Sequence, residues 1–254
     1  MHIIRGIAVA FSTYSKIPMP QFVWKEEDMR YSMCFFPWIG GVIGMFFFGW
    51  AVLCEKFAVG NVCYALIGAA IPLMISGGFH VDGYMDTMDA FHSYQSREKK
   101  LEILKDSHIG AFAAIMLALY YMIDIAAISE IHTQKAVSAV AAVFFLARCF
   151  SGIAVMTLQP AKKEGLLYTF ASSAQKVRVK AALYFQAALC VAIMLLVSGW
   201  YGAAAIGAAL LSFFYFKKKS YKELGGITGD TAGFFVTVCE AAAAAAVAVA
   251  GYFL

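Results

Sequence analysis

Long stretches of the sequence carry no charged side chain. The longest, Ala181–Phe216, is 36 residues long, and two others, Cys34–Cys54 and Phe57–Phe79, are 21 and 23 residues long. A helix crosses the hydrocarbon core of a bilayer with roughly 17–25 apolar residues, so the longest stretch suffices for two crossings of ~18 residues each. Hydrophobic residues make up 62% of the chain and charged residues 14%. This composition excludes an ordinary soluble domain, a disordered chain and a small disulfide-stapled domain, and it indicates an integral membrane protein.

Three further apolar stretches each carry a single ionisable residue: Ala111–Ser129, Ala136–Leu158 and Thr231–Leu254. With Ala181–Phe216 turning near residues 198–202, the sequence predicts about seven transmembrane helices, because backbone groups in lipid must satisfy their own hydrogen bonds. Met1–Tyr14 is apolar but too short to cross, so we expect an interfacial or re-entrant helix there. The predicted fold class is all-α, a polytopic membrane helix bundle in which residues 1–254 form a single transmembrane domain.

The basic residues are distributed unevenly over the predicted loops. Of the 20 Lys and Arg residues, 17 fall in segments that must share one side of a seven-span bundle. Lys56 and Lys135 fall on the other side, and Arg148 lies inside a predicted span. The positive-inside rule then predicts that the basic side and the N-terminus are cytoplasmic and that the C-terminus lies outside. The basic segments indicate topology and attraction to anionic lipid, and not nucleic-acid binding.

Asp82, Asp86 and Asp89 follow the second apolar stretch at spacings of four and three residues. This spacing predicts that the three carboxylates share one face of a helix. Like charges on one face repel unless a cation lies between them, and carboxylate oxygens at this density suit Mg²⁺, which shares its sites with substrate phosphates. A solvated acidic helix face is the alternative. The apolar residues and glycines among the acids favour a metal site.

Two glycine-containing turns open predicted spans on the same side. One is Gly225–Asp230, and the other is Lys105–Gly110. Backbone N–H groups in such turns can hold a phosphate at a helix N-terminus, although Thr and Asp at these positions are also ordinary N-caps. Together with the three aspartates, the turns predict a metal–phosphate site at the membrane surface.

Three ionisable residues remain inside the predicted spans: Asp124, Arg148 and Glu240. Charges are costly in lipid, so these side chains should face the interior of the bundle or water. Arg148 would either reach a substrate phosphate or pair with Asp124 or Glu240. For Glu240, lining the pocket and pairing with a cation are both open.

Two segments carry a resemblance to a known family. The first is Gly77-Gly78-Phe79-His80-Val81-Asp82-Gly83, which continues through Asp86-Thr87 to Asp89-Ala90. The second is Arg97-Glu98, followed by Glu102-Ile103, Lys105-Asp106-Ser107 and Ile109-Gly110. Both are similar to the signature of the cobalamin synthases, the adenosylcobinamide-GDP ribazoletransferases. Supporting matches are Ile17-Pro18-Met19-Pro20, Phe36-Pro37 with Gly40 and Gly44, and Gly226-Ile227-Thr228-Gly229-Asp230-Thr231. The resemblance covers nearly the whole chain.

The resemblance implies an Mg²⁺-dependent transferase of cobalamin biosynthesis. Its substrates would be adenosylcobinamide-GDP and α-ribazole or its 5′-phosphate, and its products adenosylcobalamin or its phosphate, and GMP. Such an enzyme would lie in the plasma membrane of a bacterium or archaeon, with its active site cytoplasmic. Glycines such as Gly40, Gly41 and Gly44 allow close helix contacts, within one chain or in a homo-oligomer.

The implied site residues fall into three groups. The metal-binding candidates are Asp82, Asp86, Asp89, Asp106 and Asp230. The catalytic candidates are Asp89, His80, His92 and Lys105, where each histidine is either a general base or a hydrogen-bonded bystander. The substrate-binding candidates are Gly77, Gly78, Lys105, Ser107, Thr228, Gly229 and Arg148. We expect a wide cavity whose walls include residues 91–105 and 159–180.

Two other functions fit parts of the pattern. A CDP-alcohol phosphotransferase-like enzyme also has clustered aspartates on a helix of a membrane bundle, but here Gly83 follows the first aspartate and no Ala-Arg pair accompanies the motif. A cation-coupled transporter would use Asp124, Arg148 and Glu240 as its pathway. Against transport, most acidic residues cluster at one surface, and the two halves show no repeat.

Overall fold

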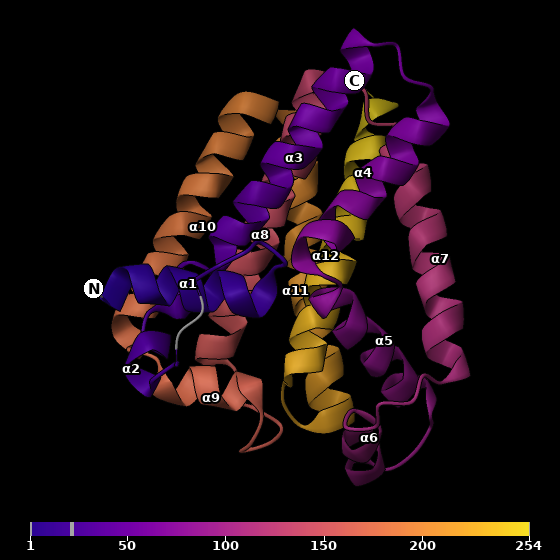
Figure 1. Cartoon of the computed structure of the whole chain (residues 1–254). Coiled ribbons are helices and arrows are strands. Elements are labelled where there is room, and N and C mark those ends of the chain that lie inside the picture. Colours follow the sequence, from indigo (N-terminus) through magenta and orange to yellow (C-terminus); the bar gives the residue numbers. More distant parts are fainter. Residues whose placement is uncertain (1, 21–22, 254) are drawn as a thin grey trace.

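The computed structural model describes residues 2–20 and 23–253, and these form a bundle of helices (Figure 1). Five helices are long and apolar enough to cross a membrane: α3 (Phe36–Lys56), α7 (Ala111–Ile128), α8 (Gln134–Thr157), α10 (Lys176–Ser198) and α12 (Gly229–Gly251). Within the described residues the only extended pairing is an isolated parallel bridge between Pro160 and Ile227. The predicted polytopic helical fold is confirmed, while Met1 and Leu254, at the ends of the predicted domain, lie outside the described residues.

The predicted number of spans differs from the structure at two places. The second span is bent: α4 (Asn61–Ser76) and α5 (Phe79–His92) meet at 97°, so they form either a broken span or a re-entrant loop, and the described chain has five or at most six candidate spans. The other difference is α11 (Trp200–Leu224), which is a continuous helix but ends in a basic segment and is not among the candidates. Sequence analysis counted its apolar part as a full span.

The bend between α4 and α5 has a local cause. Gly77 and Gly78 both have positive φ angles, 67° and 84°, which L side chains rarely adopt. A Cβ on Gly77 would also lie 2.5 Å from carbon atoms of the Lys16 side chain. The two glycines therefore end α4 and turn the chain, so that the aspartate-bearing helix runs across the end of α4.

The centre of the bundle is formed by α8 and α12, which are the most buried of the candidate spans. Gly40 and Gly44 of α3 pack directly on α8. A Cβ on Gly40 would lie 2.0 Å from the carbonyl oxygen of Phe144, and a Cβ on Gly44 would lie 2.2 Å from that of Ala141. These two glycines thus serve a helix contact within the chain. The predicted turn between the last two stretches is also present, at Gly199, between α10 and α11.

Several short elements gather at one end of the bundle. Figure 1 shows α5, α6 (Arg97–Ile103) and α9 (Leu166–Ser173) beside the N-terminal end of α12, whereas the C-terminus lies at the opposite end. The N-terminal helix α1 (His2–Tyr14) lies across the long helices, and α2 (Glu26–Met29) and the 3₁₀ turn η1 (Ser32–Cys34) connect it to α3. The short apolar helix predicted at the N-terminus is therefore present.

Candidate functional site

The three aspartates of the first motif lie on α5, as predicted from their spacing. Helix α5 packs closely on α12 through glycine: a Cβ on Gly83 would lie 2.8 Å from the carbonyl oxygen of Asp230, and one on Gly233 would lie 3.1 Å from that of His80. This close approach brings Asp230 near the acidic face, so that Asp86 interacts electrostatically with Asp82, Asp230 and Asp89. Two motifs separated by more than a hundred residues thus form one acidic cluster.

Asp89 has a second role at this site. Its two carboxylate oxygens accept hydrogen bonds from the backbone N–H groups of Gly110, at 2.7 Å, and Ala113, at 2.8 Å. These groups belong to the first turn of α7, where N–H groups lack partners within the helix. Asp89 therefore caps α7 from a neighbouring helix and ties the two sequence motifs together.

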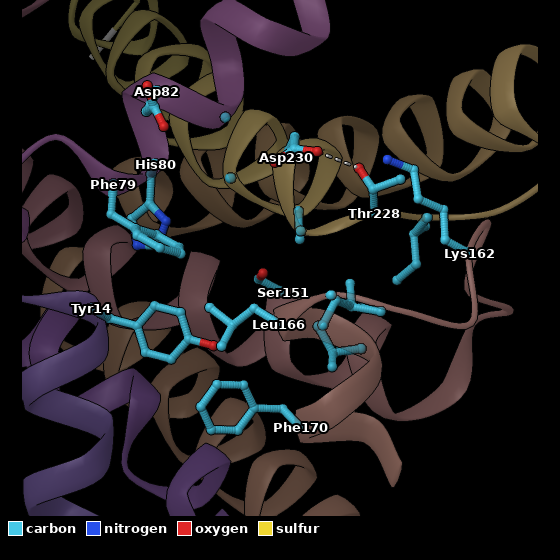
Figure 2. Close-up of a pocket in the computed structure, with 18 of the residues that line it drawn as sticks. Tyr14, Phe79, His80, Asp82, Ser151, Lys162, Leu166, Phe170, Thr228 and Asp230 are labelled. Carbon is cyan, nitrogen blue, oxygen red and sulfur yellow. Dashed lines mark hydrogen bonds between the residues drawn. The ribbon is translucent and has the colours of Figure 1, made fainter. Parts of the chain in front are cut away.

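A cavity of about 480 Å³ opens beside the acidic cluster. Its lining comes from α1, η1, α3, α5, α8, α9 and α12, and from the segments that precede α7, α9 and α12. Figure 2 shows that the labelled aromatic residues and Asp230 occupy different parts of it. The polar part contains Asp82, Thr228, Gly229, Asp230 and the basic residues Lys105 and Lys162. The other part contains Tyr14, Met33, Phe36, Phe79, His80 and Phe170.

The polar part of the cavity is organised by the N-terminus of α12. Thr228 caps this helix by accepting a hydrogen bond from Thr231 N at 3.1 Å, and its hydroxyl donates to Asp230 Oδ2 at 3.3 Å. Lys105 pairs with Glu164 across the opening. Burial lowers the pKa of Lys162, and the nearby Asp230 carboxylate opposes that shift. Two lysines and a helix N-terminus therefore border the acidic cluster, as a phosphate site requires.

A second cavity, of about 470 Å³, lies between α1 and the bend of α4 and α5. Gly77 and Gly78 line it, as do hydroxyl-bearing side chains of α1 and the exposed Lys16. Phe79 and Asp82 line both cavities. Asp82 therefore lines two cavities, one mainly apolar and one whose lining mixes polar and apolar side chains.

Six predicted site residues line neither cavity: Asp86, Asp89, His92, Asp106, Ser107 and Arg148. His92 contacts the carbonyl oxygen of Met88 through Nδ1 at 2.8 Å and stacks on Phe112. Asp106 pairs with the His108 ring at 2.6 Å, and the hydrogen bonds from His108 lower the pKa of this exposed carboxylate. Ser107 is exposed in the same loop.

Arg148 is the last of these residues. Its Nη1 lies 2.6 Å from Glu240 Oε1 and donates to the carbonyl oxygen of Phe144 at 2.7 Å, with the side chain 1% exposed. This geometry corresponds to pairing inside the bundle, one of the two alternatives left open by the sequence for both residues. Asp124 is also buried, on α7.

Sequence analysis missed several residues that line the cavities. Tyr14, Ser151 and Phe170 come from three separate helices, and nothing in their local sequence distinguishes them from other apolar or small residues of a membrane bundle. Phe36 belongs to one of the supporting matches but was not predicted to line the site. Lys16 was counted only as a marker of topology. The prediction that residues 159–180 form a wall is confirmed, because Lys162, Glu164 and residues of α9 line the larger cavity. The prediction that residues 91–105 form the other wall is wrong apart from Lys105, since the rest of this segment lines neither cavity.

The oxygen donors in the acidic cluster fit Mg²⁺. In the described part of the chain no ion pair neutralises Asp82 or Asp86, and these two carboxylates are one helical turn apart. The same residues contain no preformed group of three or more Asp, Glu, His or Cys that could hold a metal ion. Mg²⁺ is commonly held by only one or two carboxylates, with water and substrate phosphates completing its shell.

Comparison with known proteins gives a consistent result. The cobalamin-5-phosphate synthase family model matches residues 6–248. An adenosylcobinamide-GDP ribazoletransferase of Lachnoclostridium phytofermentans is 42% identical over 247 residues, which cover 97% of this chain and 94% of the relative. One of Clostridium botulinum is 29% identical over 243 residues, covering 94% of this chain and 95% of the relative. No solved structure matches the chain. The chain therefore belongs to the cobalamin-5-phosphate synthase family and is an enzyme of cobalamin synthesis.

Proposed function

We propose that this protein joins adenosylcobinamide-GDP to α-ribazole, or to α-ribazole 5′-phosphate, and releases GMP. Both similar proteins described above are named adenosylcobinamide-GDP ribazoletransferases. The structural observation that carries the proposal is that two cavities meet at Asp82. A transferase with two substrates needs two binding regions that open onto one reacting centre, and phosphoryl transfer needs that centre to neutralise charge.

In the proposed reaction a ribose hydroxyl of the nucleoside attacks the pyrophosphate phosphorus that carries the cobinamide. A new O–P bond forms, the bond to the bridging oxygen breaks, GMP leaves, and the hydroxyl proton passes to a base. Asp82 and Asp86, with Asp230 beside them, would hold Mg²⁺, which supplies charge neutralisation at the pyrophosphate oxygens. Lys105, Lys162 and Lys16 border the cluster and would position the phosphates.

The general base is best sought among the carboxylates. Asp82 is exposed to both cavities, whereas both oxygens of Asp89 already accept hydrogen bonds from α7. His92 points its Nδ1 at a carbonyl oxygen of its own helix. Because Asp82 would also hold the metal, its oxygen that does not bind Mg²⁺ is the one placed to accept the hydroxyl proton, and it is better placed than either of these residues.

The test is an assay of the purified protein in detergent with adenosylcobinamide-GDP, α-ribazole and Mg²⁺. Chromatography should detect GMP and the cobamide in equal amounts, and both should disappear when the metal is chelated and return when Mg²⁺ is added in excess. Absence of both products from folded protein supplied with Mg²⁺ would refute the proposed activity. Formation of both at an unchanged rate after chelation would refute the proposed metal dependence.

We also propose that the cavity end of the bundle faces the cytoplasm, in the plasma membrane. The support is the bias of basic residues, since 17 of the 20 lie in segments assigned to one side by the sequence. The substrates are large, charged and made inside the cell, so a site on that face would receive them directly.

A further inference from the structure

The aromatic part of the larger cavity is built around His80. Its ring centroid lies 5.5 Å from that of Phe79, 5.7 Å from that of Phe36 and 6.3 Å from that of Tyr14. Phe170, from α9, packs on the other side of Tyr14 at 5.8 Å. Three aromatic rings from three helices therefore lie around one imidazole, and a fourth ring extends the cluster through Tyr14. Figure 2 shows Tyr14, Phe79, His80 and Phe170 at the same side of the cavity.

His80 lacks any hydrogen-bond partner in the described part of the chain. Its side chain is 5% exposed, and neither Nδ1 nor Nε2 has a protein partner there. An unpaired polar group in an apolar environment is costly, and most buried polar groups in proteins are paired. Because His80 lines a cavity of about 480 Å³, a molecule in that cavity can supply the missing partner.

We propose that the aromatic part of the cavity binds the planar heteroaromatic base of the accepting nucleoside, and that His80 donates a hydrogen bond to the free ring nitrogen of that base. This inference rests on the proposed function, because it names the part of the same site that takes one of the two substrates. A neutral imidazole carries one N–H donor, and a ring nitrogen that is not bonded to the ribose is an acceptor. The surrounding rings would stack on the faces and edges of the base.

The lining distinguishes the base of this nucleoside from guanine. Polar side-chain atoms in this part come from His80, Tyr14 and Ser151, whereas Met33, Val155, Leu167 and Phe170 supply apolar surface. Guanine has several polar groups along its edges, and most of them would lose their water partners here without replacement. A benzimidazole-like base offers one acceptor and a large apolar surface. The volume also suits a nucleoside, since pockets for small molecules typically have ~300–1,000 Å³.

The position of His80 also suits the reaction. Asp82 follows it by two residues on α5 and lines the same cavity, and Thr228 and Asp230 lie beyond it on α12. A base bound at His80 would therefore direct its ribose towards the acidic cluster, where the attacking hydroxyl is needed. The lysines and the second cavity remain available for the pyrophosphate-bearing substrate.

The test compares two nucleosides that differ in one ring atom. The first is α-ribazole, and the second is the corresponding indole riboside, in which a C–H replaces the free ring nitrogen. Titration calorimetry on the full-length protein in detergent should show that the wild type binds α-ribazole about tenfold more tightly, the size of one net hydrogen bond. His80→Phe should weaken binding of α-ribazole by a similar factor while leaving the indole riboside nearly unchanged, so that the preference is lost.

The matched control is His132→Phe, which makes the same substitution at an exposed histidine at the other end of α7. It should keep the wild-type preference. Equal affinity of the wild type for both nucleosides would overturn the inference, and so would equal weakening of both by His80→Phe. The wild-type comparison decides the question even where the variant does not fold. The inference and the proposed function can fail separately. An active enzyme that binds α-ribazole and the indole riboside equally well contradicts the inference alone. A protein that prefers α-ribazole but releases no GMP contradicts the proposed function.

Discussion

At the scale of single residues, Asp82 and Asp89 separate two roles that the sequence could not distinguish. They lie on the same helix and belong to the same motif, but Asp82 faces both cavities and Asp89 caps α7. The spacing of the three aspartates does not show that backbone N–H groups about twenty residues further along the chain, at the start of α7, donate hydrogen bonds to Asp89. Substitution of each acid by its amide should therefore have different consequences.

Asp82→Asn should lower turnover by at least about a hundredfold, since loss of even an outer partner of a metal ligand typically costs 10–100-fold. Its thermal stability should be unchanged or slightly higher, because the substitution removes one like charge beside Asp86. Steady-state GMP release and thermal unfolding in detergent would measure both effects. Glu55→Gln, at an exposed carboxylate near the end of α3, is the control and should behave as the wild type. Full activity of Asp82→Asn would contradict the site.

Asp89→Asn should instead destabilise the protein by ~1 kcal/mol, within the range for loss of a helix N-cap. The amide of asparagine keeps one acceptor oxygen for one of the N–H groups of Gly110 and Ala113, but it places an NH₂ group, which cannot accept, against the other. Comparison of the melting temperatures of Asp89→Asn and Asp82→Asn, at equal detergent and pH, would measure this difference. A melting temperature of Asp89→Asn equal to that of the wild type would show that the cap contributes nothing.

The pair of Asp106 and His108 gives a prediction about pH. The hydrogen bond and charge of Asp106 raise the pKa of His108 above its ordinary value of 6.5. Any stability from this exposed pair is thus present below pH 6.5 and is lost as the pH rises through the pKa of the folded state. In NMR titrations the His108 ring should titrate above 6.5 in the wild type and closer to 6.5 in Asp106→Asn. An unchanged midpoint would contradict the pairing.

At the scale of elements, the contact between α5 and α12 depends on Gly83. A Cβ there would lie 2.8 Å from a backbone oxygen of α12, and backbone cannot move as easily as a flexible side chain. Gly83→Ala should therefore destabilise the protein by ~1–3 kcal/mol, as overpacking does, and lower activity by separating Asp86 from Asp230. Gly207→Ala on α11, where a Cβ would meet nothing within 4 Å, is the matched control. Equal stability and activity of the two variants would show that the close contact is not needed.

Helix existence was predictable from the sequence more readily than helix continuity. The long apolar stretches, each with at most one charged residue, predicted α3, α7, α8, α10 and α12, because hydrophobic length alone determines them. The 97° bend between α4 and α5 was not predicted, since Gly77 and Gly78 lie inside an apolar run and glycine is common in transmembrane helices. The acidic cluster was predicted from its motifs, whereas the aromatic lining was not, because it is assembled only by the packing of separate helices.

At the scale of the whole molecule, the C-terminus lies at the end of the bundle opposite to α5 and α9 (Figure 1), two helices that line the larger cavity. If the cavity end is cytoplasmic, an alkaline phosphatase joined to the C-terminus should be exported and active, and a green fluorescent protein at the same place should not fluoresce. A green fluorescent protein joined after Lys163, in the segment between α8 and α9, should fluoresce. The reverse pattern would contradict the proposed orientation.

The larger cavity also bears on how a bulky corrinoid can be used at all. At about 480 Å³ it accommodates a nucleoside but not a nucleoside together with a macrocycle. In the proposed reaction the corrin ring would stay outside this cavity, and only its phosphorylated side arm would reach Asp82 from the neighbouring cavity. An enzyme that contacts the side arm of its substrate and not the ring should have the same affinity for corrinoids with different groups on the far face of the cobalt. Corrinoids that differ only in that group should therefore compete equally for the enzyme.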